Sequence, residues 1–422
     1  MITIGKIFVG MDVSLKDIKV NVINIDGDVL AKFTITNDKE GAALLENKVA
    51  ELTGKTPVDS ILFGLEATSV YSWHIQNYIA DSEILKPFHP SVIVFRPKII
   101  KDFKSSLGHL PKNDAVDANA IAERLRFGRL PKGCPVDFRY LALQRLTRYR
   151  HHIVVSTTRE KAYLLSNLFL KFSGLTQDKV LSDNFGAVAT ELLTSDLDLD
   201  TLADMEISEL IDFIVSYGSE YLGNPVETAV KLKQLAAKSF RVNSALDRSL
   251  NTIIRSCFDN IKSMHTLKKG VEKPIKSQVS SIFRDEYLCL TSVKGIGDVI
   301  AAGLISEIGG IYRFENDNAL AKFAGLYWSE HQSGEFTAED SNLRKTGNDY
   351  LRYYFVQAAE HMRMYLPEYE QYYSRKYNEA RTHQHKRAIV LTARKAVRLI
   401  FALLRNNKLY TSQPKKEMVL KT

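Results

Sequence analysis

The stretch Ile7-Phe8-Val9-Gly10-Met11-Asp12 decides how the first part of this chain folds. Its apolar residues predict a buried β-strand, and an aspartate directly after such a strand is costly to bury unless it is paired or binds a metal ion. A second apolar run, Ile61-Leu62-Phe63-Gly64-Leu65, ends in the same way at Glu66. Two strand ends therefore carry acidic side chains, and carboxylate oxygens are the ligands that hard divalent cations take.

Two further acids, Asp114 and Asp117, lie three residues apart at the start of a helical pattern, with Asn113 as its candidate cap. Residues at this spacing share one helix face. Any one of the four acids alone is more often solvated or paired, so the prediction depends on their order as a set. Two cations about 3.5–4 Å apart can activate an attacking oxygen and stabilise a leaving one in phosphodiester cleavage.

The periodicity around these acids predicts an α/β domain. Alternating residues predict strands over 19–24 and 29–35, and apolar runs predict strands over 61–66 and 92–95. Helical spacing predicts helices over 38–52, 70–80 and 114–127. Three strands followed by alternating helices and strands form a mixed sheet with helices on its faces. This is the element order of the ribonuclease-H-like fold.

The rest of the chain predicts an all-α arrangement. Long helical patterns over 140–170 and 226–268 repeat an apolar residue every three or four positions. Such a seam forms either an antiparallel hairpin inside one subunit or a coiled coil between subunits, and the spacing leaves both open. The predicted domains are 1–140, the catalytic α/β domain; 141–285, the long helical region with an acidic insertion at 181–230; 286–365, a helical domain; and 366–422, a basic helical extension.

Length and charge limit the possible partners. A chain of 422 residues is expected to hold two or three domains, and its formal net charge is +8. Residues 91–170 carry 15 Lys/Arg against 6 Asp/Glu, and residues 341–422 carry 17 against 6. Residues 181–230 carry 11 acids and no Lys or Arg. Two basic regions that flank an acidic one suggest a polyanionic partner, although solvated helix faces give the same composition.

Several classes of protein do not fit the composition. No apolar run reaches the length of a membrane span, and the first residues do not form a signal peptide. Cys134, Cys257 and Cys289 fit neither a zinc spacing nor a disulfide framework, so a cytoplasmic location is expected.

A Gly-x-Gly turn lies in Val293-Lys294-Gly295-Ile296-Gly297-Asp298, between two helical patterns. This is typical of a helix-hairpin-helix, in which backbone N–H groups at a helix N-terminus hold a phosphate without reading the bases. Lys294, Gly295 and Gly297 are the candidate contacts. An ordinary turn between two helices is the alternative.

A third motif pairs Ser333, in Gln332-Ser333-Gly334, with basic and amide side chains downstream. A hydroxyl in a loop can attack a phosphodiester if it is deprotonated, and nearby cations offset charge on the transition state. The spacing alone is weak evidence because Ser-Gly is a common turn. The candidate nucleic-acid contacts are Arg344, Lys345, Asn348 and Arg352.

Tyrosines and basic residues alternate near the end of the chain. They are Tyr365, Tyr369, Tyr372, Tyr373 and Tyr377, with Arg375, Lys376 and Arg381. Such a mixture can stack on bases and contact phosphates, although tyrosines of this kind more often pack half-buried between helices.

Taken in order, the motifs resemble those of the DEDD insertion-sequence transposases, a family that includes Piv-type DNA invertases and bridge-RNA-guided recombinases. The motifs that carry the resemblance are Met11-Asp12-Val13-Ser14, Gly64-Leu65-Glu66-Ala67-Thr68, Asn113-Asp114-Ala115-Val116-Asp117-Ala118, Gly295-Ile296-Gly297, Phe323-Ala324-Gly325-Leu326, Gln332-Ser333-Gly334 and Lys345-Thr346-Gly347-Asn348. They cover roughly residues 1–175 and 285–365. The acidic segment after Ser333 departs from the basic, glycine-rich one that is usual in the family.

The resemblance implies a RuvC-like domain in which Asp12, Glu66, Asp114 and Asp117 hold Mg²⁺ or Mn²⁺. It also implies a transposase domain in which Ser333 forms a transient phosphoserine link to DNA. The implied partners are donor and target DNA, a structured guide RNA (the bridge RNA) and further copies of the chain in a homodimer or homotetramer.

Three other functions fit parts of the sequence. A junction resolvase needs the carboxylates and the basic surface but not Ser333. An actin-like kinase needs a second glycine-rich phosphate loop, which the sequence lacks. A non-catalytic DNA-binding protein needs none of the acids.

Overall fold

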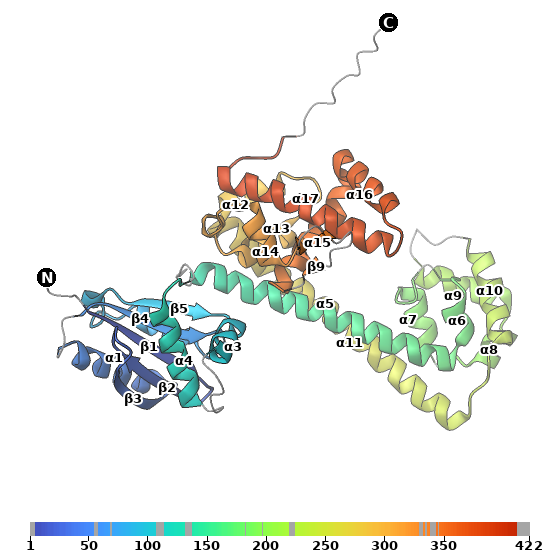
Figure 1. The fold of residues 1–422 in the computed structure, drawn as a ribbon. Helices are drawn as coiled ribbons and strands as arrows, with labels where there is room; N and C mark the ends of the chain where they lie inside the picture. The colour runs from blue at the N-terminus through green and yellow to red at the C-terminus, as the bar shows by residue number, and fades with distance from the viewer. Residues whose placement is uncertain are drawn as a thin grey trace, which may run out of the picture. The chain divides into compact units, whose positions relative to one another are not determined.

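The apolar run before Asp12 forms the middle strand of a five-stranded sheet (Figure 1). The structure is a computed structural model that describes residues 5–54, 58–67, 70–106, 114–130, 137–181, 183–195, 197–218, 224–328, 332–333, 336–337, 343–344 and 346–411. The chain divides into two compact units, Met1–Asp137 and Phe138–Thr422.

The first unit contains five strands and four α-helices among its described residues. The strands are β1 (Gly5–Val13), β2 (Asp17–Ile23), β3 (Val29–Thr36), β4 (Val58–Glu66) and β5 (Ser91–Phe95). The helices are α1 (Lys39–Thr53), α2 (Trp73–Ala80), α3 (Pro97–Ser106) and α4 (Asp114–Phe127), with a short 3₁₀ turn, η1 (Lys86–Phe88).

The sheet has the order β3-β2-β1-β4-β5. Strands β1 to β3 are antiparallel, whereas β4 is parallel to both β1 and β5. The mixed sheet expected from the sequence is therefore confirmed, and its strand order and directions fit a ribonuclease-H-like fold.

Each face of the sheet buries a different set of β1 side chains because neighbouring residues in a strand point to opposite faces. Val9 and Met11 pack with α1 and α2 in one core. Phe8 packs with β5, α3 and α4 in the other. Helix α4 thus covers the face to which the even-numbered residues of β1 point.

The second unit is almost entirely helical. Its α-helices are α5 (Phe138–Lys171), α6 (Ser173–Gln177), α7 (Ala187–Thr194), α8 (Leu199–Asp204), α9 (Ile207–Tyr217), α10 (Pro225–Lys238), α11 (Ser244–Ile282), α12 (Arg284–Thr291), α13 (Asp298–Ile308), α14 (Asp317–Ala324), α15 (Asp349–Tyr365), α16 (Pro367–Glu379) and α17 (Gln384–Asn406). Its described residues also form a 3₁₀ turn, η2 (Ile311–Arg313), and the two-residue strands β6 (Tyr327–Trp328), β7 (Gln332–Ser333), β8 (Phe336–Thr337) and β9 (Leu343–Arg344).

Two long helices, α5 and α11, lie side by side and take part in both hydrophobic cores of this unit (Figure 1). One core joins them to α12 to α17. The other joins them to α6 to α10. The apolar seams predicted for these helices are therefore buried, at least in part, against each other within one chain, whereas a coiled coil between subunits stays a prediction.

The structure differs from the sequence-based expectations in three places. The helix expected over 226–268 is two helices, because Ser239 ends α10 in an extended conformation and the Asn243 side chain accepts a hydrogen bond from Ala245 N to begin α11. The acidic stretch 181–230, expected to be an insertion of uncertain order, forms helices that share a core. Helices α16 and α17, from the expected extension 366–422, bury Tyr369 and Val397 in the same core as α13 and α15. None of the described helices is long and apolar enough to cross a membrane.

Candidate active site

Asp12, the second-last residue of β1, and Glu66, the last residue of β4, lie at the same end of neighbouring strands. Strands β1 and β4 are parallel, with Gly10 opposite Gly64 and Met11 opposite Leu65. The next residues of the two strands, Asp12 and Glu66, continue this register. Met11 and Leu65 are fully buried on the α1 side. Alternation along the strands therefore points both acids to the face covered by α4.

Two glycines explain why α4 can lie so close to the acids. A Cβ atom on Gly10 would lie 2.0 Å from Ala118 O and 2.5 Å from Ala122 N, both on the α4 backbone. A Cβ atom on Gly64 would lie 2.8 Å from the Leu125 side chain. The helix therefore packs directly on the strand backbones, which brings its first turns to the end of the sheet where the acids lie.

The electrostatics of the two acids favour a bound cation. Burial raises the pKa of Glu66 above its ordinary value, and the neighbouring charge of Asp12 raises it further. Lys104 acts in the opposite direction and lowers this pKa. Two half-buried carboxylates that disfavour each other's charge are suited to a divalent ion, because its charge offsets the repulsion and carboxylate oxygens are its preferred ligands.

Asp117 lies on the second turn of α4, where Lys104 of α3 forms an ion pair with it. Both side chains are largely buried, with exposed fractions of 26% for Asp117 and 21% for Lys104. Lys104 is not among the site residues expected from the sequence. The residues next to Lys104 in the sequence do not indicate its role. Asp117 lies 13 residues later, in α4, and Glu66 lies on β4.

Asp114 is the first residue of α4, but its side chain lies outside the described part of the structure, as does Asn113. Within the described residues, no group of three or more His, Cys, Asp or Glu side chains is arranged to hold a metal ion. Asp12 and Glu66 thus fit a divalent ion by chemistry and by electrostatics. The full set of four ligands remains a prediction.

Ser333 lies in the second unit, in a short antiparallel pair in which it is opposite Phe336. The residues that join the two strands, including Gly334, lie outside the described part of the chain, as do the side chains of Ser333 and Arg344 and all of Lys345. The Arg344 backbone pairs with Tyr327 of β6. The two candidate sites thus belong to different units of the chain.

Asn348 and Arg352 make contacts within the protein. The Asn348 amide donates to Glu307 Oε2 at 2.7 Å, and its Oδ1 accepts from Leu351 N at 3.1 Å, which caps α15. Arg352 donates to Ala324 O at 3.3 Å and forms an ion pair with Asp349. Asn348 therefore already uses both ends of its side chain, although the sequence suggested it as a DNA contact.

The Gly-x-Gly turn joins α12 to α13. Gly295 has φ +99°, and a Cβ atom there would lie 2.8 Å from His361 C of α15, so this glycine is required for backbone packing. Gly297 precedes α13, and a Cβ atom there would meet nothing within 4 Å. The Asp298 carboxylate, in the first turn of α13, accepts a hydrogen bond from Tyr287 Oη at 2.7 Å and pairs with Lys276 at 2.9 Å. Phosphate binding by Lys294, Gly295 and Gly297 stays a prediction, and Asp298 places a negative charge beside that turn.

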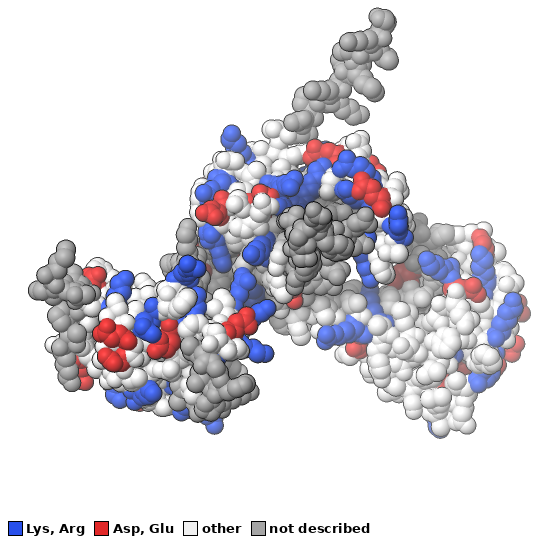
Figure 2. Space-filling view, in the orientation of Figure 1, with Lys and Arg blue, Asp and Glu red and all other residues white. Residues whose placement is uncertain are grey.

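The tyrosines near the end of the chain pack against cations of the protein itself. Lys395 lies 4.5 Å from the Tyr369 ring centre and 5.0 Å from that of Tyr372. Arg363 lies 4.5 Å from that of Tyr373. Burial raises the pKa of Tyr369, which belongs to the core. Figure 2 shows basic side chains over α16 and α17 with acidic ones among them.

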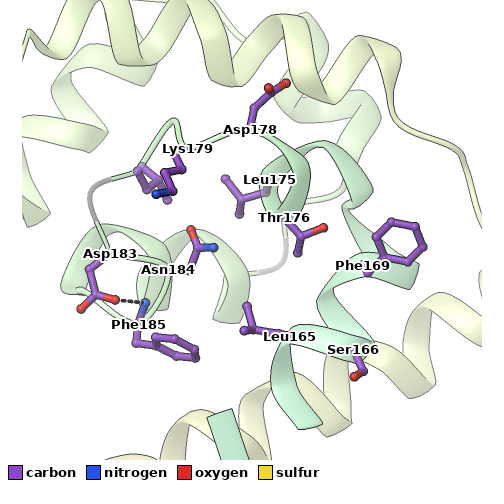
Figure 3. A pocket seen from close by; sticks show the side chains of 11 residues that line it. Leu165, Ser166, Phe169, Leu175, Thr176, Asp178, Lys179, Asp183, Asn184 and Phe185 are labelled. Carbon is purple, nitrogen blue, oxygen red and sulfur yellow. Dashed lines mark hydrogen bonds between the residues drawn. The ribbon is translucent and has the colours of Figure 1, made fainter. Parts of the chain in front are cut away.

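A cavity of about 770 Å³ lies between the end of α5, α6 and the segment before α7 (Figure 3). Its lining mixes apolar side chains, among them Leu165 and Phe185, with polar ones, among them Asp178 and Lys179. Asp183 Oδ1 accepts a hydrogen bond from Phe185 N at 2.9 Å at its edge. No cluster of catalytic side chains accompanies this cavity among the residues that line it.

Two parts of the chain match family models of transposases. Residues 9–172 match a family model described as "Transposase", and residues 287–374 match one described as "Transposase IS116/IS110/IS902 family". The chain is 21% identical over 398 residues to "Insertion element IS116 uncharacterized 44.8 kDa protein" of Streptomyces clavuligerus, across 93% of this chain and 96% of that protein.

Two other similarities are more limited. "Insertion element IS110 uncharacterized 43.6 kDa protein" of Streptomyces coelicolor is 26% identical over 167 residues, which are 39% of this chain and 40% of that protein. A solved structure, "T. thermophilus RuvC in complex with Holliday junction substrate", covers 29% of this chain and 97% of its own, with 13% identity and a TM-score of 0.23. A similarity this low has no weight for fold or function.

Proposed function

Because the chain belongs to the IS116/IS110/IS902 family of transposases, we propose that it is a metal-dependent DNA recombinase that moves an insertion sequence by serine chemistry. The observation that carries the proposal is the placement of Asp12 level with Glu66 on the face covered by α4, with the pKa of Glu66 raised. The proposed partners are donor and target DNA, a structured guide RNA and a second or further copies of the chain.

Asp12, Glu66, Asp114 and Asp117 would hold Mg²⁺ or Mn²⁺ in this reaction. When bound, such an ion lowers the pKa of a hydroxyl or water that it coordinates, and it stabilises negative charge on phosphate. Asp12 and Glu66 would contribute ligands from β1 and β4, and Asp117, with Asp114 as its proposed neighbour, would contribute ligands from the start of α4. Lys104 would place positive charge beside the reacting phosphate.

Ser333 is the proposed nucleophile. Its Oγ forms a bond to the phosphorus, the bond from phosphorus to the leaving nucleoside oxygen breaks, and that oxygen takes a proton as the serine loses one. The phosphoserine ester then keeps the energy of the broken bond, so attack by another DNA hydroxyl restores a phosphodiester and frees Ser333. Arg344 and Lys345 would offset the charge of the transition state.

Four variants of the full chain test the proposal. Asp12→Asn should abolish Mg²⁺-dependent DNA processing and preserve DNA binding, whereas Asp59→Asn, at the exposed start of the same β4 that ends in Glu66, should preserve both. Ser333→Ala should abolish the covalent protein–DNA adduct and strand joining. Ser249→Ala, at an exposed serine of α11 that belongs to none of these motifs, serves as its control.

The outcomes separate the alternatives. If Ser333→Ala still joins strands, serine chemistry is ruled out; cleavage without joining in the unmodified chain would indicate a junction resolvase. Unchanged recombination by Asp12→Asn would rule out the metal site. Recombination that needs no RNA from the flanks of the element would rule out RNA guidance.

A further inference from the structure

Glu307 of α13 is a buried acid that the proposed chemistry does not use. Only 2% of the residue is exposed. Its carboxylate accepts four hydrogen bonds: from Arg148 Nε at 2.7 Å, Arg148 Nη2 at 2.9 Å, Gln144 Nε2 at 3.2 Å and Asn348 Nδ2 at 2.7 Å. Three separate parts of the second unit, α5, α13 and the start of α15, therefore meet at one side chain.

The chemistry of this cluster makes it sensitive to small changes. A buried carboxylate is tolerated when a guanidinium pairs with it through two hydrogen bonds and the remaining lone pairs are also satisfied. The hydrogen bonds to Glu307 raise the pKa of Arg148 against the effect of burial. Removing one partner would leave the others buried and incompletely bonded, which costs more than the lost bond contributes.

The Asn348 end of the cluster closes the segment that carries Ser333. Asn348 N donates to Phe323 O at 2.7 Å. A Cβ atom on the preceding Gly347 would lie 2.6 Å from Gly325 N, so the backbones before and after this segment touch. Within it, β6 pairs with β9 and β7 with β8, the pair that contains Ser333.

We infer that Glu307 and Arg148 are positioning residues for Ser333: they hold Asn348, and through it the base of segment 325–348, against the long helix α5. This inference rests on the proposed role of Ser333. It assigns no substrate contact to either residue. The pair instead fixes where the serine segment begins and ends, so that binding energy is not lost in ordering it during the reaction.

A conservative pair of variants tests the inference. Glu307→Gln keeps the size of the side chain but replaces one acceptor oxygen with an NH₂ group, which faces donors from Arg148 and Asn348. Glu272→Gln is the matched control. Glu272 of α11 accepts a hydrogen bond at 2.7 Å from Nε of Arg150, which also lies on α5, so this pair joins α11 to α5 and does not involve Asn348.

Two readouts are needed. In Glu307→Gln, amide hydrogen exchange of residues 327–328, 343–344 and 346–351 should rise about tenfold, as expected for loss of a charge-assisted hydrogen bond. The rate of strand joining at saturating DNA should fall by at least tenfold, with little change in the Kd for DNA. Glu272→Gln should change neither. If Glu307→Gln does not fold, Arg148→Lys, which keeps the charge and loses the two-point contact, replaces it.

A reciprocal exchange provides the rescue. In the double variant Glu307→Gln/Asn348→Asp, the amide of residue 307 can donate to the carboxylate of residue 348. Aspartate is also a good N-cap for α15. Exchange protection and strand joining should both recover in part.

The inference is overturned if the amides of the segment are as well protected from hydrogen exchange in Glu307→Gln as in Glu272→Gln. It is also overturned if the double variant Glu307→Gln/Asn348→Asp restores neither this protection nor strand joining. Failure of the proposed function is distinguishable from this result. If Ser333→Ala retains strand joining, the serine role is ruled out, whereas hydrogen exchange still decides whether Glu307 holds the segment.

Discussion

The ammonium group of Lys104 lies against the carboxylate of Asp117, so α3 supplies a cation to the acids gathered at the end of the sheet. The same charge lowers the pKa of Glu66, in opposition to burial and to Asp12. One lysine thus acts on acids from two different elements, α4 and β4. It occupies the kind of position that a divalent ion would take.

Replacement of Lys104 by Met should strengthen metal binding. The variant removes a positive charge that repels an incoming ion and frees the Asp117 carboxylate from its ion pair. We expect Mn²⁺ to bind about tenfold more tightly, or ~1.4 kcal/mol, in calorimetric titrations of the full chain. Lys101→Met, on the exposed side of α3, is the control. Equal Mn²⁺ affinity in both variants would contradict competition between Lys104 and the ion.

Replacement of Gly10 by Ala should destabilise the first unit. The added Cβ would meet backbone atoms of α4 at 2.0 and 2.5 Å, so the helix must move off the sheet. We expect the free energy of unfolding, measured from hydrogen exchange of β1 amides, to fall by about 2 kcal/mol. Gly270 lies at an exposed position of α11 where a Cβ atom would meet nothing within 4 Å. Gly270→Ala should therefore raise the free energy of unfolding measured at α11 amides by about 0.5–1 kcal/mol. A neutral Gly10→Ala would show that α4 can shift at little cost.

Asp298 should contribute to the acid sensitivity of the second unit. The hydrogen bonds that its carboxylate accepts from Lys276 and Tyr287 hold its pKa below the ordinary value of 3.8. A carboxyl with a lowered folded pKa stabilises the fold above pH 3.8, and this contribution is lost as the pH falls through the folded pKa. Asp298→Asn should therefore be less stable at pH 7 and should lose less stability between pH 4 and 2 in thermal unfolding scans. Parallel pH profiles for the two proteins would contradict this.

Basic residues around α17 should contribute to nucleic-acid affinity through phosphate contacts. Arg381 and Lys386 are exposed at its start. If each contacts one phosphate of duplex DNA, replacing both by Gln should reduce the slope of log K against log salt by about 1.8. Binding measured across a salt series gives the slope, and Lys179→Gln/Lys238→Gln, in the α6 to α10 region, is the control pair. An unchanged slope would indicate that Arg381 and Lys386 are simply solvated.

The sequence predicted the α/β part of the fold well because its signals are local. Apolar runs before Asp12 and Glu66 identify buried strands, and their parallel pairing follows from the elements between them. It did not predict Lys104 as a partner of Asp117, because that contact depends on how α3 packs. It suggested Asn348 as a DNA contact, although a capping amide and a DNA-binding amide look alike until Glu307 is placed beside it. The break at Ser239 was also missed, because apolar spacing continues across it.

The glycines on which helix α4 packs provide a way to identify related sequences. In both strands a glycine stands two places before the acid, Gly10 before Asp12 and Gly64 before Glu66, and each lies where the helix presses on the sheet. A carboxylate that follows a glycine at this spacing can be recognised from the sequence alone. The glycine has no side chain, and this absence leaves room for the helix to pack on the strand. Searches for distant members of such enzymes can therefore weight the paired spacing Gly-x-Asp and Gly-x-Glu above overall identity.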